Sequence, residues 1–160
     1  MQQRIITCPN MRANWYYLLQ EAKLNTGFEI DESLENYLIL TLNNLNPDTH
    51  NFSDSVSIKY MNAISNNDEQ RWQKLRDVGD QCLLINGMFP EISIKRNVTL
   101  NYYAVIGRQA YKTLANQPEN KVHLDKDLFN NLSTHFVGLS DLMHIMFKPK
   151  YKSNSKLGLI

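Results

Sequence analysis

Apolar residues recur at helical spacing in six segments of the chain, and no segment alternates convincingly as a half-buried strand does. Side chains three and four positions apart share one face of a helix, so this spacing predicts amphipathic helices. The segments are expected at about 11–24, 32–45, 53–65, 67–86, 99–117 and 125–147. The chain is therefore predicted to be all-α, with about six helices in a bundle or an orthogonal array.

Residues that stabilise helix ends occur where the spacing begins and stops. A side-chain oxygen at the position before a helix can accept from one of its free backbone N–H groups. Glycine just after a helix can adopt the left-handed conformation that ends it, and Gly27 and Gly87 are the candidates. The candidate N-caps are Asp31, Asn67, Thr99 and Asp125.

The length of 160 residues is that of one domain of ordinary size. We expect residues 1–148 to form a single helical domain, because no linker or repeat divides them. Residues 149–160 carry Lys150, Lys152 and Lys156 and are expected to form a flexible basic tail.

Charge and hydropathy argue against several classes of function. The net charge is +1, so no overall field attracts nucleic acid, and nucleic acid is not an expected partner. The mean hydropathy is −0.43 and no apolar stretch approaches the roughly 20 residues of a membrane span. The first 25 residues show no signal-peptide pattern, which favours a cytoplasmic protein.

Familiar catalytic and cofactor motifs are missing from the sequence. It contains no nucleophile elbow, no phosphate-binding loop and no dinucleotide fingerprint. His135 and His144 are not spaced as metal ligands, and two cysteines alone make no metal site. No catalytic residue, cofactor or metal is therefore predicted. Cys82 lies on an apolar helical stripe and is expected to be a buried, inert thiol, whereas Cys8 lies near the N-terminus.

Two glycines fall inside predicted apolar helix faces. Gly79 and Gly107 each cost about 1 kcal/mol relative to alanine in a helix interior. Close crossing of two helices would offset that cost, so both positions are predicted to be packing notches.

One polar cluster deserves a chemical interpretation. Asp80 lies at the edge of an apolar arc, one turn after Arg76, and can pair with Arg108 on the next long helix or act as a general base. His135 falls on the apolar face of the last predicted helix. A boundary ion pair and a core histidine are the expected roles, and an enzyme built on Asp80, Arg108 and His135 is one alternative.

Apolar residues outside the main stripes suggest a binding surface. Either several helices are buried on two sides, or these residues form a patch for a partner. The favoured interpretation is a non-enzymatic protein-interaction module that binds a second copy or another protein. A second alternative is a small-molecule-binding protein whose pocket is lined by Trp72, Tyr103, Tyr111 and Phe136. The candidate interface residues are Leu84, Met88, Val105 and Ile106.

The segment 76–141 carries a specific string of residues. It reads Gly79-Asp80, Leu83-Leu84, Gly87 and Phe89-Pro90-Glu91, followed by Tyr102-Tyr103, Gly107 and Ala110-Tyr111. This string resembles an uncharacterised family of small all-helical bacterial proteins. The resemblance implies a bacterial, cytoplasmic, all-helical protein and carries no activity, cofactor or catalytic residue.

Overall fold

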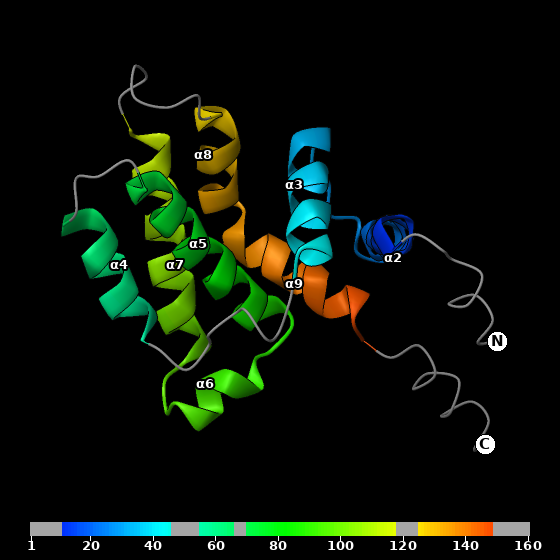
Figure 1. Ribbon diagram of the computed structural model, residues 1–160. Coiled ribbons are helices and arrows are strands. Elements are labelled where there is room, and N and C mark those ends of the chain that lie inside the picture. The colour runs from blue at the N-terminus through cyan, green and yellow to red at the C-terminus, as the bar shows by residue number, and fades with distance from the viewer. Residues whose placement is uncertain (1–10, 46–54, 66–69, 118–124, 149–160) are drawn as a thin grey trace.

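The computed structural model describes residues 11–45, 55–65, 70–117 and 125–148 (Figure 1). Eight helices make up 81% of these described residues, which contain no strand. The all-α prediction is therefore confirmed, with eight helices in place of about six. The helices are α2 (Met11–Thr26), α3 (Glu32–Asn43), α4 (Val56–Ser65), α5 (Arg71–Gly87), α6 (Glu91–Lys95), α7 (Leu100–Ala115), α8 (Lys126–Thr134) and α9 (Phe136–Met146).

Two differences account for the additional helices. The predicted helix over 125–147 is interrupted at His135, whose φ of −101° and ψ of 17° are not helical, and the chain turns there from α8 into α9. This turn places the fully buried ring of Phe136 6.2 Å from that of Tyr111. The stretch expected to be a plain connector contains the short helix α6, which follows Pro90. Proline is well suited to the start of a helix because its missing N–H would have no partner there.

Three of the predicted N-caps are confirmed. The side chains of Asp31, Thr99 and Asp125 each accept a hydrogen bond from the backbone N–H three residues later, at 2.9, 3.2 and 3.1 Å. The predicted cap Asn67 lies outside the described residues. In the structure, Gln70 immediately precedes α5.

The two predicted terminal glycines differ. Gly27 follows α2 with a φ of 72°, which is the left-handed conformation expected of it. Gly87 does not have a positive φ and is instead the last helical residue of α5. A Cβ at Gly87 would lie 2.7 Å from the Cβ of Met143, so this glycine serves the contact between α5 and α9.

Helices α5 and α7 form the centre of the fold. They make the most extensive contact between any two helices, with α4 packed on α5 and α8 packed on α7 (Figure 1). Helix α9 contacts both α5 and α2, and α3 packs against α2 and α8. None of the described helices has the length and apolar character that a membrane span requires.

Glycines admit large side chains into this core. A Cβ on Gly79 would lie 2.5 Å from the Tyr111 ring. At Gly107 it would lie 2.6 Å from the Phe136 ring and 2.7 Å from the Cβ of Cys82. Both predicted notches are thus present, but their nearest contacts are side chains and not the backbone of a crossing helix.

A methyl group at Gly107 tests this packing. We expect Gly107→Ala to lower the free energy of unfolding by about 1–3 kcal/mol, because overpacking outweighs the roughly 1 kcal/mol gained in helix propensity. Urea denaturation monitored by circular dichroism measures the change. Gln109→Ala, at an exposed position of the same helix, should stay within about 0.5 kcal/mol of wild type. Equal stability of the two variants would contradict the packing described for Gly107.

Candidate functional site

A carboxylate at the centre of the fold joins three helices. Asp80 of α5 accepts two hydrogen bonds on its Oδ1 atom, from the hydroxyl of Tyr37 at 2.5 Å and from that of Tyr111 at 2.7 Å. Tyr37 comes from α3 and Tyr111 from α7. The Asp80 side chain is 18% exposed, and the two bonds fill acceptor sites on one of its two oxygen atoms.

Arg76 extends this network toward the surface. Its Nε donates to the Tyr37 hydroxyl at 3.2 Å and lies 3.9 Å from Oδ2 of Asp80. The guanidinium carbon is 5.2 Å from the centroid of the Tyr37 ring, within the range of a cation–π contact. Tyr37 therefore holds the guanidinium through both its hydroxyl and its ring. Only 29% of the Arg76 side chain is exposed.

Burial determines the protonation of these groups. It raises the pKa of Asp80 to about 6, although the bonds from both tyrosines and the charge of Arg76 act in the opposite direction. Burial also raises the pKa values of Tyr37 and Tyr111 well above the usual range, and the negative charge of Asp80 adds to that effect. Both phenols therefore stay neutral donors near neutral pH, where the carboxyl is the group that titrates.

An open groove lies beside this network, between α3, α5 and α8. Its volume is about 500 Å³, within the range of sites for small molecules. We call it the α3/α5/α8 groove. Its apolar and aromatic lining consists of Tyr37, Leu40, Trp72, Leu128 and Phe129.

The groove also carries charge. Arg76 lines it, and Arg12 at the start of α2 adds a second guanidinium. Asp125 contributes a carboxylate, but that side chain accepts the capping bond of α8 from the Leu128 backbone. The rings of Tyr37 and Phe129 pack edge to face, with their centroids 5.9 Å apart, and form an aromatic wall of the groove. The groove thus combines an aromatic surface with a restrained cation.

The structure does not bring the predicted polar cluster together. Asp80 bonds to Tyr111 on α7 and not to Arg108, which is exposed and lines a separate hollow of about 390 Å³ beside Ser133. His135 is exposed, because the helix expected to bury it ends there, and its ring packs on Phe28 at 6.3 Å. The expected Asp80–Arg76 contact is present.

Most of the residues of the predicted aromatic pocket are packed in the hydrophobic core. Tyr103, Tyr111 and Phe136 have at most 2% of their surface exposed, so they leave no space for a ligand among them. Trp72 is the exception, because it lines the α3/α5/α8 groove. Tyr37 is a residue of the site that the sequence analysis does not identify. It lies on the apolar stripe of its own helix, and nothing in the spacing of that stripe indicates a bond to a carboxylate 43 positions later.

The predicted interface residues separate in the structure. Leu84 is completely buried, which corrects its assignment to a surface patch. Helix α5 contacts α4, α7 and α9, so its side chains are covered on several sides. Met88 and Ile106 are half-buried against the core, and Val105 is 58% exposed.

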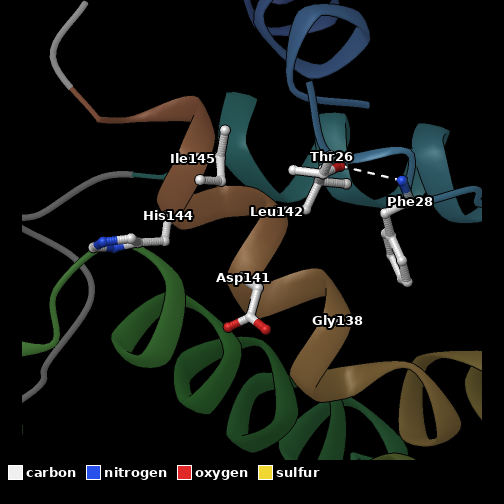
Figure 2. Close-up of a pocket in the computed structure, with 7 residues that line it drawn as sticks. All are labelled: Thr26, Phe28, Gly138, Asp141, Leu142, His144 and Ile145. Carbon is white, nitrogen blue, oxygen red and sulfur yellow. Dashed lines mark hydrogen bonds between the residues drawn. The ribbon is translucent and has the colours of Figure 1, made fainter. Parts of the chain in front are cut away.

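A second hollow of about 470 Å³ lies on α9 (Figure 2). Phe28 closes one side of it, with its ring over Gly138, and Thr26 accepts a bond from the Phe28 backbone N–H. Asp141 and His144 are exposed, and their polar groups project in different directions (Figure 2). Across the described residues, no three His, Cys, Asp or Glu side chains are grouped to hold a metal ion.

No family model, curated protein or solved structure matches the chain. The likeness of segment 76–141 to a helical bacterial family therefore stays a resemblance. The function proposed below rests on the geometry of the groove and its charged groups.

The raised pKa of Asp80 predicts a pH-dependent stability. A carboxyl whose folded pKa exceeds its unfolded value stabilises the fold most below the unfolded pKa, near 3.8, and loses that contribution as pH rises through about 6. Chemical denaturation of wild type and Asp80→Asn from pH 4 to pH 7.5 measures this effect. The difference between the two proteins should shift in favour of Asn by up to roughly 3 kcal/mol. Asp77→Asn, at an exposed position of α5, should show a nearly constant difference. A constant difference for Asp80→Asn would contradict the raised pKa.

Cys82 has no exposed surface, and burial raises the pKa of its thiol. In a Cys8→Ser background we expect a thiol reagent to label Cys82 only after denaturation, because the thiolate is the reactive form. Labelling of the native protein within minutes, followed by mass spectrometry, would show that the thiol is accessible. Cys8 itself lies outside the described residues.

Proposed function

We propose that the protein is a non-enzymatic binding protein for a small organic anion with an apolar or aromatic body. The α3/α5/α8 groove would hold the body against Trp72 and Phe129, and Arg76 would bind the anionic group. The observation that carries this proposal is the restrained guanidinium of Arg76 at the edge of an aromatic wall.

Restraint of an arginine favours anion binding. A free arginine loses side-chain entropy when it binds a ligand, whereas Arg76 is already fixed by the Tyr37 hydroxyl and ring. Its Nε is used in that contact, and the guanidinium has further N–H donors in a planar fork. Such a fork matches the oxygens of a carboxylate, sulfonate or phosphate.

The position of Asp80 favours binding over catalysis. Tyr37, which is 6% exposed, lines the groove, and Asp80 is not among the lining residues. The Asp80 carboxylate therefore contacts the Tyr37 phenol and not the space of the groove. A general base must come within hydrogen-bond reach of the proton that it removes. Asp80 is thus a positioning residue, acting on Arg76 through Tyr37.

Association with a protein partner, a second copy included, stays a prediction. Of the four residues expected at an interface, Val105 has the largest exposure and Leu84 has none. The single domain over 1–148 with a basic tail, and the bacterial cytoplasmic setting, are likewise kept as proposals.

Trp72 provides a direct test of the groove. In a Trp15→Phe background it is the remaining tryptophan, so its fluorescence reports on groove occupancy. We expect saturable quenching by 2-phenylethanesulfonate with a dissociation constant below about 1 mM, which is a modest binding energy for a ligand of this size. The uncharged 2-phenylethanesulfonamide should bind roughly tenfold or more weakly, because its oxygens carry no net negative charge to pair with Arg76.

Matched charge variants locate the anion. Arg76→Gln should weaken sulfonate binding to about the level of the sulfonamide and should affect sulfonamide binding much less. Arg108→Gln removes the same charge from an exposed position of α7 and should leave both affinities unchanged. Equal affinities for the sulfonate and the sulfonamide, or an equal loss in the two variants, would contradict the proposed function.

A further inference from the structure

We propose that the α3/α5/α8 groove binds its anion together with a proton, which Asp80 takes up. This inference rests on the proposed function and adds a regulation of the same site. It follows from the sharing of one guanidinium, that of Arg76, between a fixed carboxylate and the bound anion.

The distances bring the two negative groups close together. Oδ2 of Asp80 lies 3.9 Å from Nε of Arg76, and an anion bound to the same guanidinium would lie roughly 6–8 Å from the carboxylate. Like charges at that separation repel by on the order of 1–3 kcal/mol at a typical effective dielectric constant. Ionised Asp80 therefore opposes binding of the anion, and protonation of Asp80 removes the opposition.

Apart from Arg76, the groups that face Asp80 offer no positive charge to balance a bound anion in addition to the Asp80 carboxylate. From α3 and α7 it faces the neutral phenols of Tyr37 and Tyr111. From its own helix it faces Arg76 and the carboxylate of Asp77, whose charge favours the protonated form of Asp80. The buried Cys82 thiol, also on α5, has a pKa raised by burial and is uncharged near neutral pH.

The charged groups that line the groove support the same conclusion. Arg12 and Arg76 are its cations, and Asp125 is its lining carboxylate. Ionised Asp80, with Asp77 near it, adds negative charge behind the groove wall, which opposes the entry of an anion. Protonation of Asp80 removes one of these negative charges and leaves the Arg76 guanidinium to the anion.

The hydrogen-bond network can accept the proton. A protonated carboxyl has one O–H donor and keeps acceptor capacity, whereas each phenol both donates and accepts. Tyr37 and Tyr111 can thus stay bonded to Asp80 in either state, and the proton need not leave a buried group without a partner. The pKa of about 6 places this proton uptake just below neutral pH.

Thermodynamic linkage makes the effect measurable in two ways. If the anion raises the pKa of Asp80, then protonation of Asp80 must raise the affinity for the anion by the same factor. A sulfonate is a suitable probe because it stays ionised throughout the working range of pH, so the protein supplies the titrating group.

The experiment measures the affinity of 2-phenylethanesulfonate in the Trp15→Phe protein between pH 5 and pH 8, with Asp80 present or replaced by Asn. With Asp80, affinity should rise roughly tenfold from pH 7.5 to pH 5. In Asp80→Asn it should be high and nearly constant, because Asn is neutral and keeps an acceptor oxygen. Calorimetry in two buffers of different ionisation enthalpy should show net proton uptake near pH 6.5 with Asp80 and much less with Asn.

The outcomes separate this inference from the proposed function. Sulfonate binding that depends on Arg76 but not on pH, with no proton uptake, would overturn the proton coupling alone. An equal pH dependence in Asp80→Asn would assign the proton to another group and would also overturn it. Failure of the sulfonate to bind at any pH would overturn the proposed function and this inference with it.

Discussion

The contact of Tyr111 with Gly79 and Asp80 determines how the central helices and the groove fit together. The missing side chain of Gly79 lets the Tyr111 ring approach α5 closely, and the hydroxyl of that ring reaches the next residue, Asp80. Tyr37 reaches the same carboxylate oxygen from α3. Three helices therefore meet at one oxygen atom, and the direction of each is restricted by a hydrogen bond as well as by apolar packing.

This arrangement carries a free-energy cost when Asp80 is ionised. Burial of the carboxyl raises its pKa, so the ionised form of Asp80 costs free energy near neutral pH. An apolar residue in place of Asp80 would remove that cost but leave the hydroxyls of Tyr37 and Tyr111 without their acceptor. A buried carboxyl in such a network favours one fixed arrangement, and here that arrangement restrains Arg76 at the groove.

Local features of the fold were predictable from the sequence, and contacts between distant segments were not. The caps Asp31, Thr99 and Asp125 act through bonds to residues three positions away, so their chemistry is contained in short stretches of sequence. The break at His135 occurs instead together with a contact between distant segments, in which Phe136 packs near Tyr111. Helical spacing continues through that break and does not indicate it.

The candidate site shows the same division. Helical spacing identifies Asp80 as a carboxyl at the edge of an apolar face, and its neighbour Arg76 lies one turn away on the same helix. Its partner on α7 is Tyr111, three positions beyond the predicted Arg108. The two side chains lie about one turn apart on neighbouring positions of α7, where Tyr111 is buried and Arg108 is exposed. A helical wheel gives the relative positions of residues on one helix but not the face that a second helix presents.

A comparison within the molecule shows why Asp80 is the group suited to take up a proton. Glu35 is also a buried carboxyl, with 9% exposure, but it forms an ion pair with Lys23 and accepts a bond from Gln20 at 3.3 Å. Its negative charge is thus matched by direct contact with a cation. Asp80 has neutral phenols as its direct partners, and its cation stays 3.9 Å away at the edge of the groove. The charge of Asp80 is therefore only partly balanced within the protein. A ligand that competes for Arg76 would reduce that balance further and so favour the protonated carboxyl, which is the basis of the proposed proton uptake.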